Sequence, residues 1–422
     1  MYELVTLANG LRIVLEHIEY VNSVSVGIWI ENGSRNEEKL NSGISHFIEH
    51  MLFKDTYKRT AKQIVEDIED VGGQINAFTS KEATCFYVKL LDSHLDLGLD
   101  VLSDMLFNGK FLEEDIEKEK KVVIEEIKMN DDNPEDVLSD IHILSAYGND
   151  TISMPILGTE ESVNKLNRDS ILEYMSKYYV PQNTVISICG NFNKNNIYSQ
   201  IENYFGTWQR SKNKKSFYST PKMENKFLFR QKDIEQTYFS LGLQGLPIGH
   251  KDSYSLILLT NLFGGGASSN LFQKIREELG LCYTIYSYSS ALVNTGIITI
   301  YAALNSEFIK EAYNEIEKEI FKFSKESLGE EKLRKAKEQL KGNYILGLES
   351  TSSRMFNNGK TVINLNKINK PDEILKKIDN INLRDIDRVL DETFRKGIIN
   401  AGFVSKDYEL VKNSLPINIK SI

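Results

Sequence analysis

The same order of predicted strands and helices occurs twice along this chain of 422 residues. In each half, alternating apolar residues predict strands that come before a group of helices and a strand pair, and further helices with one late strand follow. The predicted strands cover residues 3–7, 11–16, 23–30, 74–79, 83–91 and 184–189, and then 227–230, 236–243, 283–289, 297–303 and 398–404. This repeat predicts two similar domains of the α+β class.

A polar and basic segment near the midpoint separates the two halves. From Gln209 to Asn225 the hydrophobic periodicity disappears, and lysine, serine and asparagine accumulate. Such a composition is typical of an exposed connection between domains. We therefore predict a first domain over residues 1–212, a linker over 213–225 and a second domain over 226–422.

Charge and composition exclude several classes of function. With a formal net charge of −9 and a pI of about 5.4, the chain lacks the extended basic surface that binds nucleic acid. No apolar run approaches the length that crosses a bilayer, and the start of the chain lacks the pattern of a secretory signal. We therefore predict a cytoplasmic location with no membrane partner. The three cysteines, Cys85, Cys189 and Cys282, form no CxxC pair, and we expect buried reduced thiols.

Two of the six histidines, His46 and His50, lie four residues apart within a helix predicted at about 43–53. This spacing puts both imidazoles one turn apart on a single face of the helix, where they can bind one Zn²⁺ ion. Glu49 lies close to the same face, and its carboxylate can reach a water molecule on the metal. The pattern HxxEH therefore predicts a hydrolytic zinc site.

A catalytic zinc ion needs a third protein ligand, and an acidic helix predicted at 113–130 is the obvious source. Glu119 and Glu126 are seven residues apart, so they share one face of this helix. One of them could bind the metal while the other orients a ligand. The spacing alone does not decide between them.

These residues resemble the inverted-zinc-motif peptidases of the pitrilysin and insulinase family, most of all the mitochondrial processing peptidases and their bacterial relatives. The resemblance spans nearly the whole chain. It is carried by residues 42–54, 72–79, 119–126, 155–158 and 263–272, and by Arg276 and Tyr283. It implies two similar domains, each a mostly antiparallel sheet with helices packed on one face.

The resemblance also implies a role for each matching residue. It implies that His46, His50 and Glu126 bind one zinc ion per chain. Glu49 would be the general base, and Glu119 would assist from outside the ligand set. Substrate would be contacted by two side chains of the second domain, by a glycine-rich loop and by an edge strand, which are Arg276, Tyr283, Gly264, Gly265, Gly266, Asn76, Ala77 and Phe78.

From these roles we expect a zinc-dependent endopeptidase that hydrolyses extended or unfolded peptides inside a chamber. Family members of this length resemble half of the larger, four-domain enzymes. The resemblance therefore implies a homodimer in which Arg276 and Tyr283 of one chain face the zinc site of the other.

Three other interpretations of these sequence features compete with the peptidase. An inactive chamber-forming or scaffold subunit would have the same fold, because core subunits of respiratory complexes resemble this family without being peptidases. The small ribosylhomocysteine-cleaving lyases also carry HxxEH, but their chains are far shorter. The run from Gly264 to Gly266 invites a phosphate-loop interpretation, yet the Lys-Ser/Thr ending of that loop is absent.

Overall fold

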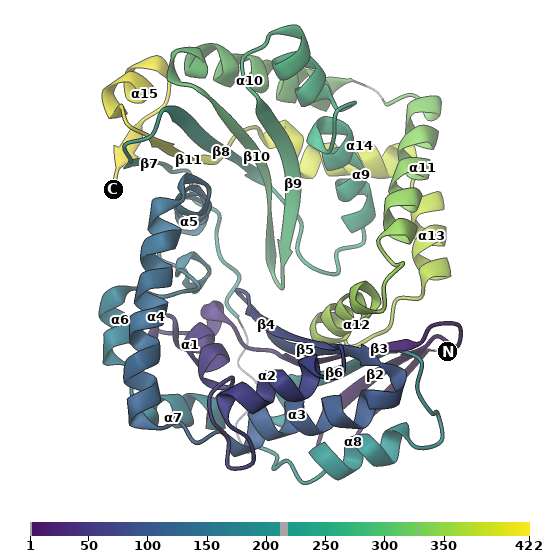
Figure 1. Cartoon of the computed structure of the whole chain (residues 1–422). Coiled ribbons are helices and arrows are strands. Elements are labelled where there is room, and N and C mark those ends of the chain that lie inside the picture. Colours follow the sequence, from purple (N-terminus) through teal and green to yellow (C-terminus); the bar gives the residue numbers. More distant parts are fainter. Residues whose placement is uncertain (1, 212–217, 327) are drawn as a thin grey trace. The chain divides into compact units, whose positions relative to one another are not determined.

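The computed structural model describes residues 2–211, 218–326 and 328–422 of the chain (Figure 1). Contacts divide the chain into two compact units, each assembled from three stretches of sequence. The first unit contains Met1–Lys128, Met154–Phe217 and Tyr344–Pro371, and the second contains Met129–Ser153, Tyr218–Asn343 and Asp372–Ile422. Over the described ranges, no helix is long and apolar enough to cross a lipid bilayer.

The first unit is built on a six-stranded sheet that is antiparallel except where β2 pairs with β6. Its strand order is β1 (Tyr2–Thr6), β2 (Arg12–His17), β6 (Thr184–Gly190), β3 (Ser23–Ile30), β5 (Thr84–Leu91) and β4 (Gln74–Thr79). Ile28 of β3 lies opposite Phe86 of β5 and Ile186 of β6, so three buried side chains share one face. β4 is an edge strand, because its described partner is β5 alone.

Helices cover one face of this sheet and form the largest apolar cluster of the unit with it. Their apolar stripes recur every three to four residues, as the sequence pattern predicts. They are α1 (Ile44–Met51), α2 (Ala61–Glu69), α3 (Leu95–Asn108), α4 (Glu113–Asp132), α6 (Glu160–Lys165), α7 (Arg168–Tyr178) and α8 (Ile197–Phe205).

A further helix, α12 (Thr351–Leu365), covers the opposite face of the same sheet (Figure 1). The central strands are buried on both faces, so the second face also needs an apolar cover. Val362 and Ile363 pack there in a cluster that includes Trp29. A Cβ on Gly359 would lie 2.1 Å from Nε1 of Trp29, so this close approach requires glycine.

The second unit also has a six-stranded sheet, which is antiparallel except where β7 pairs with β11 and with β12. Its order is β12 (Ile419–Ser421), β7 (Phe227–Gln231), β11 (Asn400–Ser405), β8 (Gln236–Gln244), β10 (Thr295–Asn305) and β9 (Thr284–Leu292). Its helices are α5 (Pro134–Tyr147), α9 (Ser253–Gly264), α10 (Ile309–Lys325), most of α11 (Glu330–Leu346), most of α13 (Pro371–Asp379), α14 (Leu383–Glu392) and α15 (Tyr408–Ser414). α5 comes from the first half of the sequence and packs on β11, β8 and β7.

Short helical turns join these elements. The 3-10 turns are η1 (Ser34–Asn36), η2 (Lys39–Asn41), η3 (Asp92–His94), η4 (Thr151–Ser153), η5 (Pro181–Asn183), η7 (Ser306–Phe308) and η8 (Phe394–Lys396). One further turn is a π-helix, η6 (Phe272–Glu278).

The predicted class, two similar α+β domains with mostly antiparallel sheets, is confirmed, and α12 adds a helix on the second face of the first sheet. The predicted boundaries miss two exchanged segments. Residues 129–153 belong to the second unit and residues 344–371 to the first. The sequence could not predict this, because the apolar stripe of a helix does not reveal which sheet the helix covers. Of the predicted linker 213–225, residues 213–217 lie outside the described residues.

Candidate metal centre

The helix that carries both histidines begins at a position that requires glycine. Gly43 has a φ of 89° and a ψ of −2°, and a Cβ there would lie 2.5 Å from the carbonyl oxygen of Leu157. The buried carboxylate of Glu37 accepts hydrogen bonds from the backbone N–H groups of Gly43 (2.7 Å) and Ser45 (2.9 Å). These bonds satisfy donors at the start of α1 and fix its position. Burial raises the pKa of Glu37 to about 7, although both hydrogen bonds oppose the shift.

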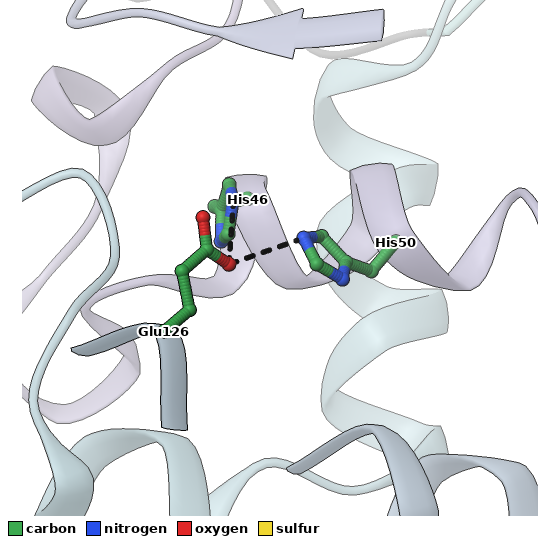
Figure 2. Close-up of side chains that lie close together, drawn as sticks. All are labelled: His46, His50 and Glu126. Atoms are coloured by element: carbon green, nitrogen blue, oxygen red, sulfur yellow. Dashed lines mark ion pairs between the residues drawn. The ribbon is translucent and has the colours of Figure 1, made fainter. Parts of the chain in front are cut away.

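His46 and His50 point toward Glu126 from successive turns of α1 (Figure 2). Their Nε2 atoms lie 3.7 Å and 3.5 Å from one oxygen, Oε2 of Glu126. Both distances exceed hydrogen-bond length, and they are close to the ~3.3 Å that separates two atoms bound at about 2.0 Å to one tetrahedral zinc ion. The three candidate ligand atoms lie within 4.8 Å of one another, and all three residues belong to the first unit.

The chemistry of this donor set fits Zn²⁺. Burial, together with the neighbouring His50 ring, lowers the pKa of His46 to about 3, so this imidazole is neutral at pH 7. Its Nδ1 atom is buried and makes no hydrogen bond to any described residue, so no group there competes for the ring. Two imidazoles and one carboxylate are three ligands of the kind that catalytic zinc sites use, with a fourth position left for water.

Glu119 contacts His50 on the side away from Glu126. Its Oε1 lies 2.7 Å from Nδ1 of His50, and its carboxylate also forms an ion pair with Lys54. Burial opposes ionisation, but the hydrogen bonds from His50 and Lys54 prevail and lower the pKa of Glu119. An ionised Glu119 accepts a hydrogen bond from Nδ1–H of His50, which leaves the lone pair of Nε2 on the side of Glu126. The structure thus distinguishes the two glutamates, which their spacing could not: Glu126 faces both Nε2 atoms, and Glu119 contacts Nδ1 of His50.

Glu49 lies beside the candidate ligands and is not one of them. Its Oε2 accepts a hydrogen bond of 2.5 Å from Oγ1 of Thr79, the last residue of β4. Burial raises the pKa of Glu49 above its ordinary value. A carboxylate with a raised pKa is a stronger proton acceptor than an ordinary one.

The predicted substrate residues Asn76, Ala77 and Phe78 lie on the edge strand β4. They pair with Tyr87, Phe86 and Cys85 of β5, and their other edge has no strand partner among the described elements. The Phe78 ring packs edge-on against Trp29, with the ring centroids 5.5 Å apart. The strand is therefore held from one side, and it runs to Thr79, which contacts Glu49.

The predicted substrate residues of the second unit gather around one pocket of about 320 Å³. Gly265, Gly266, Arg276 and Tyr283 line it, while Gly264 lies at the end of α9 against Ser287. The Arg276 guanidinium lies 4.5 Å from the ring centroid of Phe272 and 5.0 Å from that of Tyr283. Tyr283 is 78% exposed. The pocket thus presents a stacked cation and an exposed phenol.

A second group of possible metal donors is formed by His250, Asp252 and Glu392 of the second unit. Both oxygens of Asp252 accept hydrogen bonds from Arg388, at 2.9 Å and 2.5 Å. Nδ1 of His250 accepts a hydrogen bond of 3.2 Å from the backbone N–H of Asp252, so the ring proton is on Nε2. The Asp252 carboxylate and Nδ1 of His250 already have partners, and we assign no metal to this group.

Sequence reasoning missed three residues of the centre. Lys54 is four residues after His50, a spacing that could have suggested one face. Thr79 ends a predicted strand, but nothing local links it to Glu49. Glu37 lies in an irregular segment, and its contact with α1 has no sequence signal.

Family models match most of the chain. The model described as insulinase (peptidase family M16) matches residues 12–160, and the one described as peptidase M16 inactive domain matches residues 165–340. YmxG of Bacillus subtilis (strain 168), named an uncharacterized zinc protease, is 42% identical over 389 residues, with 92% of this chain and 95% of the relative covered. An uncharacterized zinc protease of Rickettsia felis is 36% identical, with 92% and 94% covered.

Solved structures share the fold. The crystal structure of a protease from Helicobacter pylori matches with a TM-score of 0.87 and covers 96% of this chain and 99% of that one. At 23% sequence identity, this likeness shows a common fold and no more.

Proposed function

Since this chain belongs to the insulinase family, peptidase family M16, we propose that it is a zinc-dependent endopeptidase that hydrolyses extended or unfolded peptides. The observation that carries the proposal is the approach of His46 and His50 to one oxygen of Glu126, at separations expected of ligands on one tetrahedral ion. A half-buried carboxylate on the same helix, Glu49, supplies the proton acceptor that a peptide hydrolase needs.

The proposed mechanism uses side chains of the first unit, of which His46, His50 and Glu126 would hold the zinc ion. A bound zinc ion would acidify a water molecule and polarise the substrate carbonyl. Glu49 accepts the proton of the attacking water and returns it to the leaving amine. Thr79 holds Oε2 of Glu49, so Oε1 stays available for this transfer. Glu119 holds His50 through Nδ1 and so fixes the orientation of that ligand.

The proposed substrate is an extended peptide that adds to β4 as a further strand. Among the described elements no strand pairs with the other edge of β4, so its backbone groups are open to a substrate, except that the N–H of Ala77 donates to Oδ1 of Asn76 at 2.8 Å. The strand runs to Thr79, which touches the general base. Hydrogen bonds to the substrate backbone do not read its side chains, so broad sequence tolerance follows.

The second unit is proposed to contribute Arg276 and Tyr283, with the loop at Gly264, Gly265 and Gly266, to substrate binding. In a homodimer these side chains would act on the zinc site of the other chain, where a phenol could stabilise the oxyanion. The test mixes Glu49→Gln chains with Tyr283→Phe chains. Activity above that of either variant alone supports the arrangement, and no recovery in verified mixed dimers contradicts it.

The test of the whole proposal is mass-spectrometric mapping of cleavage on a library of unfolded peptides. Zinc-loaded wild type is compared with Glu49→Gln and with wild type treated with a chelator. Cleavage that both treatments abolish supports the proposal. If zinc-loaded wild type cleaves nothing, an inactive chamber-forming or scaffold subunit becomes the better account. The cytoplasmic location stays a prediction, which cell fractionation tests.

A further inference from the structure

We infer that Lys54 is a positioning residue of the metal centre. Its ammonium group holds the Glu119 carboxylate in place, and this carboxylate in turn orients the His50 ring. The inference rests on the proposed zinc site and deepens it. Lys54 lies three residues after the end of α1 and four residues after His50. Its side chain keeps 31% of its surface exposed, whereas that of Glu119 keeps 6%.

The Glu119 carboxylate has a separate partner for each oxygen. Oε1 meets Nδ1 of His50 at 2.7 Å, and Oε2 pairs with Nζ of Lys54. Among the ion pairs of the described residues, Lys54 is the one lysine or arginine bound to Glu119. Without it, one buried oxygen would have no positive partner and the carboxylate could rotate away from His50. The contact therefore controls a ligand of the metal through one intermediate group.

The segment that carries Lys54 is fixed at both ends. On the α1 side, the backbone N–H of Lys54 donates to the carbonyl of Met51 at 3.1 Å, which continues the helical turn. On the other side, Oδ1 of Asp55 accepts from the backbone N–H of Ala61 at 2.8 Å. The backbone of Lys54 is thus held in place on both sides, and its side chain extends from this fixed point to the Glu119 carboxylate.

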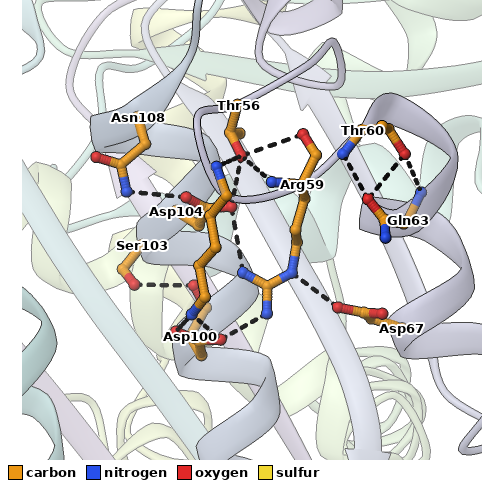
Figure 3. A network of polar contacts seen from close by, with 10 residues as sticks. Thr56, Arg59, Thr60, Gln63, Asp67, Asp100, Ser103, Asp104 and Asn108 are labelled. Carbon is orange, nitrogen blue, oxygen red and sulfur yellow. Dashed lines mark hydrogen bonds and ion pairs between the residues drawn. The ribbon is translucent and has the colours of Figure 1, made fainter.

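Arg59 anchors the rest of this loop to α2 and α3 (Figure 3). Its guanidinium donates to Asp67 at 2.7 Å, to Asp100 at 2.5 Å and to Asp104 at 3.2 Å. Thr56 adds a hydrogen bond of 2.7 Å to Asp104. Three carboxylates on one buried guanidinium hold the loop in place, so the position of Lys54 does not depend on its own ion pair.

The test measures zinc affinity directly, by competition with a chromophoric chelator at pH 7. Loss of a group that orients a metal ligand lowers affinity about 10- to 100-fold, and we expect this of Lys54→Met. Lys54→Arg keeps the charge and should recover most of the affinity. Lys58→Met is the matched control, because Lys58 lies in the same loop and its ammonium pairs with Asp100 at the surface.

A double-mutant cycle shows whether Lys54 acts through Glu119. In a Glu119→Gln background, Lys54→Met should lower zinc affinity little further, because the intermediate group is already lost. Thermal unfolding of each apo variant checks that it is folded, and Lys54→Ala replaces Lys54→Met if the latter is not.

Three results would overturn the inference: wild-type zinc affinity in Lys54→Met, an equal loss in Lys54→Arg or Lys58→Met, or additive effects in the cycle. Peptide cleavage by the wild type is measured separately. A zinc-binding wild type that cleaves no peptide contradicts the proposed function and leaves the role of Lys54 in metal binding intact.

Discussion

The two units share the order of five sheet strands, β2–β6 in one and β7–β11 in the other, but they differ in the first α-helix after the central strand β3 or β8. In the first unit this helix is α1, which carries His46, Glu49 and His50. In the second unit it is α9, whose twelve residues include no histidine and no acidic or basic side chain. The same architecture thus supports a candidate metal centre in one unit and an apolar packing helix in the other.

The exchanged helices also differ in what they bury. α12 places Asn358 against the buried carboxylate of Glu16 at 2.7 Å, in the first unit. α5 places His142 against Gly242 and Gly402 in the second unit. Each sheet is therefore completed by a helix from the other half of the sequence, with a polar group buried at the contact. Neither half of the sequence therefore contains all the elements of its own unit.

The largest expected effect comes from Glu49→Gln, which tests whether the first unit alone supplies the general base. Loss of a general base lowers kcat about 10²- to 10⁴-fold, and because Glu49 is not a ligand, zinc binding should persist. Peptide cleavage and zinc content are measured on the same samples. Glu311→Gln, an exposed change on α10 of the second unit, is the control and should leave both unchanged. Activity of Glu49→Gln within tenfold of wild type would contradict the assignment.

Removing the third ligand separates two neighbours on α4. Glu126→Gln should lower zinc affinity by at least about 100-fold, because it replaces the anionic carboxylate that both imidazoles face by a neutral amide, which is a much weaker ligand. Glu125→Gln should leave the affinity unchanged, since that carboxylate pairs with Lys128 at the surface. Zinc titration monitored by a competing chelator measures both. Equal losses in the two variants would mean that the charge of the helix, and not a ligand, sets the affinity.

Local patterns predicted much of the fold. Strands at Ser23–Ile30 and Gln74–Thr79 match the prediction to the residue, because each has alternating apolar residues and a turn signal at its end. The exchange of α5 and α12 could not be predicted, because a helical stripe shows that a face is buried and does not show against what. That information lies in contacts between residues more than a hundred positions apart.

Local spacing predicted those parts of the candidate site that lie within a single helix. His46 and His50 follow from a helical period, and so does the pairing of Glu119 with Glu126. The choice between the two glutamates depends on how α4 packs on α1, because two turns of helix place them about 10 Å apart along its axis. The role inferred for Lys54 depends on the same packing, so only the structure could suggest it.

The contact between α12 and the first sheet predicts a difference between two helical glycines. Gly359→Ala places a Cβ 2.1 Å from Trp29 and should lower the free energy of unfolding by about 3 kcal/mol through overpacking. Gly342→Ala on α11 meets nothing within 4 Å and should be neutral or stabilise by about 0.5–1 kcal/mol. Gly359 lies in the first unit and Gly342 in the second, so urea unfolding is followed by circular dichroism, which reports both units. Similar midpoints for the two variants would show that α12 can shift to relieve the overlap.

The smallest expected effect concerns pH and the helix α5. Burial lowers the pKa of His142 to about 4, from an ordinary value of 6.5. Between these values the unfolded chain binds more protons than the folded one, so stability falls as the pH is lowered from about 6.5 toward 4. Between pH 7 and pH 5 this group should account for about 2 kcal/mol.

His142→Leu isolates that contribution. The advantage of wild type over the variant in free energy of unfolding should be about 2 kcal/mol larger at pH 7 than at pH 5, because all other titrating groups cancel in the difference. Urea unfolding followed by circular dichroism at both pH values measures it, on metal-free protein so that zinc binding does not contribute. If this difference in free energy of unfolding does not change with pH, the charged His142 ring must reach water in the folded state, either through water that enters or through a shift of α5. In that case the two exchanged helices would differ in rigidity as well as in the groups they bury.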